Sequence, residues 1–301
     1  MNRHSVPTFL TLLAVFVVLV IFGLLIGLVL YSSILSLVRQ WPNYQERFAQ
    51  LLTDAAQFLQ LPEDVLIQLN ALERISNSVV SISGDFVGFL GRFVLVVIFL
   101  MFILAERRFF RERLLAAFPN ARNDRLSELF ADINRQVARY LSVKFLMSLL
   151  TAVTVGLLFS LIGVDFAFIW AVLTFLFNWI PSLGSITIGI LSSVFVLIQF
   201  APEWNLVVYG AAAMIVPQLV IGNGLDPKAI GDSLNLSPVV VIFSLLLWGW
   251  LWGIAGLFLA VPLTVAMKIL FENVPGLEFI AKLMGGRADR AVATPDTNGA
   301  G

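Results

Sequence analysis

Residues that could bind a polar solute are gathered in a few short islands of an otherwise apolar chain. The first island, residues 178–185, contains an asparagine, two serines, Pro181 and Gly184. Because proline removes a backbone donor and clashes with the preceding helical turn, we expect the helix to break here. A helix that restarts after such a break directs free N–H groups and the positive end of its dipole into the gap. The island therefore favours hydrogen bonding to hydroxyl or carbonyl groups of a solute; a purely structural kink is the alternative interpretation.

The second island, residues 222–238, brings two acids, a base and two amides together among helix-breaking residues. It is interpreted either as a cytoplasmic turn that ends two helices or as a gate, such as the tip of a re-entrant hairpin. From the two islands and the acids near them we predict a substrate-binding set and a gating or coupling set. The substrate-binding set is Asn178, Pro181, Ser182, Gly184, Ser185 and Asn223, and the gating or coupling set is Asp165, Asp226, Pro227, Lys228 and Asp232.

The third island, residues 248–256, combines three tryptophans with glycines and is followed by Pro262. Tryptophan suits the membrane interface, and small residues allow helices to approach closely. We therefore expect this island to pack and anchor helices, with the lining of a pathway as the alternative. Acids at the ends of predicted spans are expected to be solvated boundary charges, and these are Asp165, Glu203 and Asp232.

The composition argues against several kinds of catalytic site. The chain has no cysteine, and its one histidine is His4, so thiolate metal sites, disulfides and cysteine nucleophiles are excluded. A serine protease would need a base, and an intramembrane aspartyl protease would need two facing acids at membrane depth, which the sequence does not offer. We therefore expect no enzyme activity, no metal and no cofactor. The formal net charge is zero, so nucleic acid is not an expected partner.

The elements that must position these islands are apolar helices. Hydrophobic residues make up 59% of the chain and charged residues 13%, against about 25% charged in soluble domains. The mean hydropathy is +0.93, and a helix that crosses a bilayer needs about 20 apolar residues. We predict an all-α, polytopic helical membrane protein with broken or re-entrant helices in the C-terminal half. The runs without Asp, Glu, Lys or Arg are residues 6–38, 145–164, 166–202, 204–225 and 233–267.

Four parts are predicted along the chain. Residues 1–105 are expected to form N-terminal scaffold helices, with extracytoplasmic amphipathic helices at about 43–85. They are followed by a cytoplasmic amphipathic segment at 106–144, a transport-type membrane domain at 145–284 and a disordered tail at 285–301.

Charge sets the expected orientation. Residues 43–85 contain few Lys or Arg, whereas four arginines lie between residues 107 and 113. Under the positive-inside rule both termini are expected in the cytoplasm. Residues 123–141 carry one apolar stripe, which we expect on the inner membrane surface or against the protein itself; a site for a regulatory partner is the alternative.

Four stretches in order resemble the autoinducer-2 exporter family of bacterial inner-membrane proteins. Residues 164–170 lead into 178–185, which is similar to that family's Asn-aromatic-aliphatic-Pro-x-aliphatic-Gly signature. Ile221-Gly222-Asn223 precedes Asp226-Pro227-Lys228-x-x-Gly231, which resembles its acidic-Pro-basic-x-x-Gly element. Leu236-Ser237-Pro238 opens the next helix, and residues 248–253 run to Ala260-Val261-Pro262-Leu263-Thr264. The match covers about residues 6–284.

The resemblance implies a secondary transporter in the bacterial inner membrane that exports a small polar solute, with the quorum-sensing signal autoinducer-2 as the namesake substrate. It also implies a homo-oligomer, such as a pentamer, whose C-terminal half moves as a transport unit. Members usually have two more membrane helices before residues 6–38, so we expect a short variant or a truncated start. Their acidic-Pro element often has Glu where this chain has Asp226.

Two other functions stay open. Some relatives are linked to sodium–proton exchange, so a sodium–proton antiporter that uses Asp165, Asp226 or Asp232 is the first alternative. A membrane scaffold that transports nothing is the second.

Overall fold

The computed structural model describes residues 8–60, 88, 91–104, 106, 113, 123–230 and 236–286. These residues are helical, with turns between the helices and no extended strand. Five of the described helices are long and apolar enough to cross a membrane, which confirms the predicted all-α, polytopic fold class. The contacts divide the chain into two units, one of Met1–Pro119, Gly163–Ile169 and Val194–Val207, the other of Asn120–Ile162, Trp170–Ser193 and Val208–Gly301.

Several predictions made from the sequence fall on residues outside this description. They concern His4, the second amphipathic stretch within residues 61–87, the arginines at 107, 108 and 111, Asp232 and the tail from residue 287.

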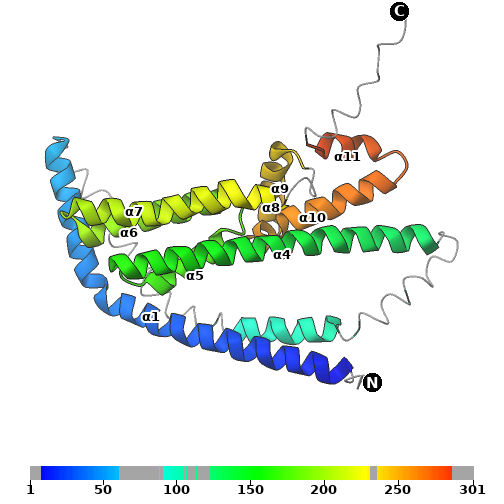
Figure 1. Cartoon of the computed structure of the whole chain (residues 1–301), viewed down its shortest axis with the longest axis horizontal. Helices are drawn as coiled ribbons and strands as arrows, with labels where there is room; N and C mark the ends of the chain where they lie inside the picture. Colours follow the sequence, from blue (N-terminus) through cyan, green and yellow to red (C-terminus); the bar gives the residue numbers. More distant parts are fainter. Residues whose placement is uncertain are drawn as a thin grey trace, which may run out of the picture. The chain divides into compact units, whose positions relative to one another are not determined.

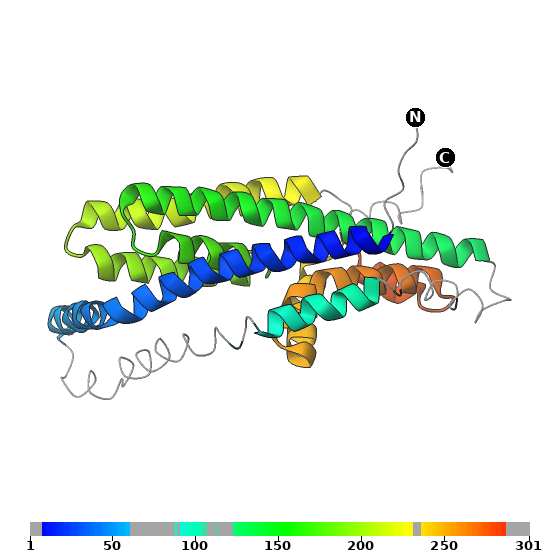
Figure 2. The same cartoon turned by 90° about the horizontal axis from the view of Figure 1, so that it is seen from below.

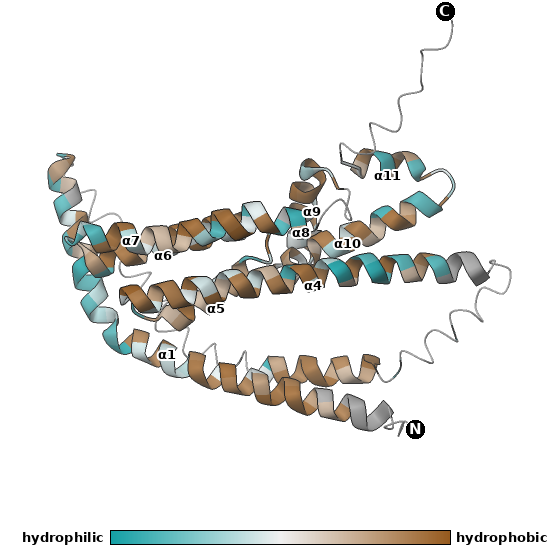
Figure 3. Cartoon of the chain, in the orientation of Figure 1, coloured by the Kyte–Doolittle hydropathy of each residue, from teal (hydrophilic) through white to brown (hydrophobic). Residues whose placement is uncertain are grey.

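The first unit is built on α1, Thr8–Phe58. The sequence predicted an apolar run to residue 38 and then a separate amphipathic stretch, but one continuous helix covers both and includes Pro42. Tyr44 and Arg47, in the turns after this proline, form hydrogen bonds with other segments of the unit. Figure 3 shows the change along α1 from a hydrophobic N-terminal half to a more polar C-terminal part.

A second helix of this unit, Gly91–Leu104, lies beside the first half of α1. Figure 2 shows it in cyan, with α1 in blue. Phe93 reaches into the space that a side chain at Gly23 would fill: a Cβ there would lie 2.3 Å from the Phe93 ring. A small residue at position 23 therefore permits this close contact.

The second unit is built on α4, Asn123–Ile162. The predicted amphipathic helix 123–141 and the predicted span from residue 145 are a single helix, because residues 123–155 contain neither glycine nor proline. The apolar stripe packs against α10, Ile254–Asn273, where buried Tyr140 joins a cluster with Val261 and Val265. Part of the stripe is therefore covered by the protein itself, while Phe130 of the stripe stays half exposed.

The helix predicted to break at Pro181 does break. α5, Ala167–Phe177, ends four residues before the proline, and α6, Leu183–Phe200, begins two residues after it. The intervening residues form a turn, in which the Ile180 N–H donates to the Phe177 carbonyl at 3.0 Å.

The next segment differs from the prediction. α7, Trp204–Pro217, continues directly into a π-helix, η1, Gln218–Leu225, and then into the short α8, Asp226–Ile230. The sequence predicted a polar turn from Gly222, but the backbone stays helical through both glycines of this segment. In a π-helix the carbonyls accept from residues five positions ahead, and the Asp226 N–H accordingly donates to the Ile221 carbonyl.

A helical hairpin, α9 (Pro238–Trp252) and α10, follows, and the short α11, Glu278–Met284, packs against α10. The hairpin turns at Gly253, whose φ of +63° lies in a region that favours glycine. Gly256 lets the two helices approach, since a Cβ there would lie 1.8 Å from the Trp248 carbonyl oxygen. The third island therefore serves helix packing, as expected.

Candidate functional site

A polar cavity of about 200 Å³ lies within the second unit. It is enclosed by α4, the turn between α5 and α6, and η1 with the start of α8. Pockets for drug-sized ligands measure about 300–1,000 Å³, so this cavity suits a smaller solute. The lining comprises Lys144, Met147, Ser148, Thr151, Asn178, Ile180, Pro181, Ser182, Ser185, Gln218, Gly222, Asn223 and Asp226.

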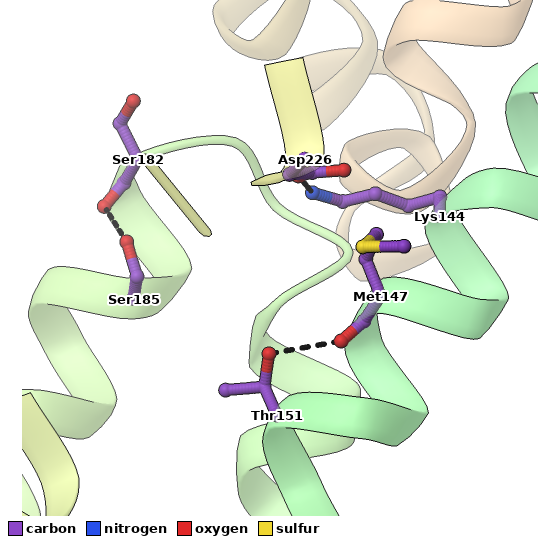
Figure 4. Close-up of polar contacts among 6 residues, drawn as sticks. All are labelled: Lys144, Met147, Thr151, Ser182, Ser185 and Asp226. Carbon is purple, nitrogen blue, oxygen red and sulfur yellow. Dashed lines mark hydrogen bonds and ion pairs between the residues drawn. The ribbon is translucent and has the colours of Figure 1, made fainter. Parts of the chain in front are cut away.

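One face of α4 contributes Lys144, Ser148 and Thr151, at the i, i+4, i+7 spacing that places residues on one side of a helix. All three are buried. The Thr151 hydroxyl donates to the Met147 carbonyl at 2.8 Å, one turn back along the helix (Figure 4). The Ser148 hydroxyl has no hydrogen-bond partner among the described residues.

The turn between α5 and α6 presents Asn178 and two serines to the cavity. The Asn178 backbone donates to the Thr174 carbonyl at 3.0 Å, which ends α5, and its side chain is buried at the cavity wall. Ser182 has a φ of +59°, a left-handed conformation that costs a non-glycine residue about 1 kcal/mol or more. The Ser185 hydroxyl donates to the Ser182 carbonyl at 3.0 Å (Figure 4). A strained turn held by local hydrogen bonds is typical of a functional position.

Two contacts outside the cavity fix this turn. A Cβ at Gly184 would lie 1.7 Å from the Phe177 carbonyl oxygen, so glycine lets α6 begin close to the end of α5. Trp179 packs between aromatic rings, with its centroid 6.3 Å from that of Phe175 and 6.2 Å from that of Phe258 on α10. These two contacts fix the residues on either side of Asn178, Phe177 and Trp179, and so hold Asn178 at the cavity.

A buried ion pair crosses the cavity. Lys144 Nζ donates to Asp226 Oδ2 at 2.5 Å, and the two side chains are only 10% and 11% exposed (Figure 4). Removing two charges from water costs several kcal/mol for each ion, and close pairing offsets that cost. The pair joins α4 to the junction of η1 and α8, and together its two members carry no net charge.

Other polar atoms of the cavity are buried without a partner. Gln218 is 7% exposed, and both its amide nitrogen and its amide oxygen have no hydrogen-bond partner in the described part of the chain. The same holds for Asp226 Oδ1 and Ser148 Oγ. Leaving such a group unpaired costs about 1–3 kcal/mol, and polar atoms of this kind commonly meet water or a ligand.

The winding of the π-helix η1 determines which of its residues line the cavity. Gln218, Gly222 and Asn223 of η1 and Asp226 at its C-terminal end all line it. π-helical segments are rare and frequently occur at functional sites. The two ends of η1 thereby supply the unpaired amide and the carboxylate of the ion pair.

Most of the predicted substrate-binding residues lie together at this cavity. Those that line it are Asn178, Pro181, Ser182, Ser185 and Asn223. Gly184 does not line it and instead allows the tight turn. Within the gating set, Asp226 lines the cavity, but its ionic partner is Lys144 and not Lys228, which is exposed on α8. Pro227 belongs to the first turn of α8.

Sequence reasoning missed several residues of the cavity, namely Lys144, Ser148, Thr151 and Gln218. A signal for the α4 residues was present: a lysine directly before an apolar run, followed by hydroxyl residues four and seven positions later. Gln218 is a single amide within the apolar run 204–225. Isolated polar residues on one face of a membrane helix usually face the protein interior or a watery cavity.

Asp165 belongs to a different cluster, within the first unit. The Tyr44 hydroxyl donates to Asp165 Oδ2 at 2.5 Å, and the Gln199 amide oxygen accepts from the Asp165 backbone N–H at 2.9 Å. The Arg47 guanidinium donates to the Gln199 carbonyl at 2.5 Å. These bonds join α1 to the turn before α5 and to the last turn of α6. Within the described ranges no group of three or more His, Cys, Asp or Glu is placed to hold a metal ion.

Comparison with known proteins gives a consistent result. A family model described as "AI-2E family transporter" matches residues 1–276. Two proteins named "Putative transport protein" are similar over most of their length. That of Borreliella burgdorferi is 36% identical over 94% of this chain and 78% of its own, and that of Haemophilus influenzae is 31% identical over 95% and 84%. The AI-2 transport protein TqsA of Escherichia coli is 37% identical over 49% of this chain and 42% of its own.

Proposed function

Since this chain belongs to the AI-2E family of transporters, we propose that it is a secondary transporter that exports a small polar organic solute similar to autoinducer-2. The chain is a multi-pass membrane transporter by family and by its apolar helices. The solute binds in the cavity between α4, the α5–α6 turn and η1. The observation that carries it is the set of buried, unpartnered polar atoms at one small cavity.

The cavity offers both kinds of hydrogen-bonding group. Asn178 and Gln218 can each donate and accept through a carboxamide, and Ser148 through its hydroxyl. A compact solute with hydroxyl and carbonyl groups would pair with these atoms and relieve the cost of burying them. The volume of about 200 Å³ limits the solute to a small molecule.

Counterflow in proteoliposomes tests this proposal. Vesicles loaded with unlabelled autoinducer-2 should accumulate labelled autoinducer-2 transiently when they contain the protein. Asn178→Ala should lower the initial rate about 2- to 10-fold, the effect of one lost neutral hydrogen bond. Asn205→Ala is the matched control, because Asn205 is exposed and lies outside the cavity lining, and its rate should equal that of the parent protein. Absence of counterflow for autoinducer-2, or equal rates for Asn178→Ala and the control, would refute the proposal.

A sodium–proton antiporter is the second candidate, and one observation favours it: Asp226 is a carboxylate at the cavity with an unpartnered oxygen. The Lys144 ammonium already occupies the other oxygen of this carboxylate, which disfavours a sodium ion and ranks the solute carrier first. Sodium-dependent proton release from vesicles that is absent in Asp226→Asn would reverse this order.

We also propose that the chain lies in the bacterial inner membrane with both termini in the cytoplasm. The arginines between residues 107 and 113, set against the few basic residues of 43–85, support this orientation. Terminal fusions to alkaline phosphatase, which is active only outside the cytoplasm, should be inactive at both ends. An active fusion at either end would reject the orientation.

A further inference from the structure

The charges at the cavity come from two residues of its lining, Lys144 and Asp226. Lys144 Nζ and Asp226 Oδ2 are 2.5 Å apart. An ion in the cavity is therefore attracted by one of the two charges and repelled by the other from nearly the same distance. The fields of the two charges therefore largely cancel for any solute in the cavity. An ionic solute would also lose its hydration on entry, at a cost of several kcal/mol, and would find no free counter-charge.

The remaining lining atoms suit an uncharged solute. Gln218 presents a donor and an acceptor, Asp226 Oδ1 an acceptor and Ser148 a hydroxyl, and all are buried without a partner in the described structure. A hydroxyl of the solute could donate to Asp226 Oδ1 or to Gln218 Oε1, and a carbonyl could accept from Gln218 Nε2. Each of these bonds forms without separating the ion pair, because Lys144 contacts the other carboxylate oxygen, Oδ2.

We infer that the Lys144–Asp226 pair is the charge filter of this transporter: it keeps the cavity electrically neutral, so that uncharged hydroxyl- and carbonyl-bearing solutes bind and ions do not. This inference rests on the proposed function and names the residues that determine its specificity. Removal of Asp226 alone leaves a positive cavity, removal of Lys144 alone leaves a negative one, and removal of both restores neutrality.

Thiol labelling measures the charge of the cavity independently of transport. The chain has no cysteine, so Ser182→Cys places a single thiol at the cavity, where Ser182 is exposed. The purified protein is treated with an anionic and a cationic methanethiosulfonate reagent, and the ratio of the two rates is measured. Asn205→Cys, exposed and outside the lining, supplies the ratio for an ordinary surface thiol.

The variants should change this ratio in opposite directions. With the pair intact, the ratio at Ser182→Cys should match that of Asn205→Cys. Asp226→Asn should raise the rate of the anionic reagent about 10-fold and lower that of the cationic reagent by a similar factor, so the ratio should change about 100-fold, for one unpaired charge taken to be about 10 Å away at an effective dielectric of about 20. Lys144→Gln should favour the cationic reagent by a similar factor. The double variant Lys144→Gln/Asp226→Asn should return to the parent ratio, which also guards against misfolded single variants.

A transport experiment uses glyceraldehyde and glycerate, which have the same carbon chain and differ in charge. The parent protein should bind and exchange glyceraldehyde in preference to glycerate, and Asp226→Asn should shift the preference toward glycerate. Labelling ratios that do not respond to either single variant would overturn the charge filter, as would a parent protein that takes glycerate as readily as glyceraldehyde. Failure of the proposed transport function looks different: no solute exchanges, while the labelling ratios still follow the charges.

Discussion

Gly184→Ala should disrupt the turn that presents Asn178 to the cavity. A Cβ at this position would lie 1.7 Å from the Phe177 carbonyl oxygen and 2.6 Å from its carbon. Both atoms are backbone, so no side-chain rotation can relieve the clash. The end of α5 and the start of α6 would have to separate by about 1.7 Å, from 1.7 Å to 3.4 Å, to reach ordinary van der Waals contact.

The cost follows from the hydrogen bonds of the turn. Separation would stretch the bonds from Ile180 N to Phe177 O, 3.0 Å, and from Gly184 N to Ile180 O, 3.1 Å. Two weakened bonds at about 1 kcal/mol each and overpacking of about 1–3 kcal/mol give a loss of about 3–5 kcal/mol. At about 2–4 °C per kcal/mol, the Tm should fall by at least about 6 °C.

Thermal unfolding of the purified protein in detergent measures this loss, with Gly189→Ala as the control. Gly189 lies in the same helix, and a Cβ there would meet no atom within 4 Å. Alanine is the better helix former by up to about 1 kcal/mol, so this variant should keep or raise the Tm. Counterflow should be lost in Gly184→Ala and kept in Gly189→Ala. Equal Tm values for the two variants would refute the assignment of Gly184 to the close approach of α5 and α6.

Three further outcomes are expected from thermal unfolding and counterflow. Lys144→Gln and Asp226→Asn should each destabilise the protein by about 3–5 kcal/mol, because each leaves a buried charge unpaired, and the double variant should lose less than the sum; additive losses would argue against the pair. Gln218→Leu should stabilise the protein by about 1 kcal/mol or more, and so raise the Tm, because it removes an unpartnered buried amide. The same variant should lower solute counterflow, and a lower Tm would contradict the unpaired state of the amide. Tyr44→Phe removes a donor from a carboxylate and should cost about 1.5–3 kcal/mol, whereas Tyr209→Phe at an exposed position should leave the Tm unchanged; equal effects would reject the role of the Tyr44 hydroxyl.

The helical framework could be predicted from the sequence because the signals are strong and local. Apolar runs of about 20 residues specify membrane helices, and Pro181 breaks one of them where expected. Gly253 likewise marks the turn of the α9–α10 hairpin. Steric signals of this kind act within one or two turns and need no knowledge of distant contacts.

Helix continuity was harder to predict. α1 continues through Pro42, although proline removes one backbone donor, and nearby Tyr44 and Arg47 contact residues more than 100 positions away. α4 continues from a polar half into an apolar half, since a change of hydropathy does not by itself end a helix (Figure 3). Hydropathy reports the solvent around a helix, whereas its ends depend on backbone hydrogen bonds.

The candidate site was predicted in part. The α5–α6 turn and Asn223 could be predicted because proline, glycine and amide residues lie close together in the sequence there. Lys144 was missed because its partner Asp226 lies 82 positions away, and Lys228 is nearer to Asp226 along the chain. Pairing across helices depends on the azimuth at which each residue leaves its helix, and the π-helical stretch changes this azimuth in a way that hydropathy does not record.

The widened turn of η1 has a consequence for how relatives of this chain should be aligned. Successive residues of a regular helix are rotated by about 100°, and those of a π-helix by less, because its hydrogen bonds join residues five rather than four positions apart. If the same residues were wound regularly, the following carboxylate would therefore swing by about a quarter of a turn or more around the axis. Lys144 would then face a different side chain, although the apolar character of the segment would hardly change. Deletion of one residue together with regular winding would largely restore the direction of the carboxylate. A relative with one gap in this stretch can therefore keep the ion pair, whereas an ungapped relative that winds regularly would present another side chain to the cavity.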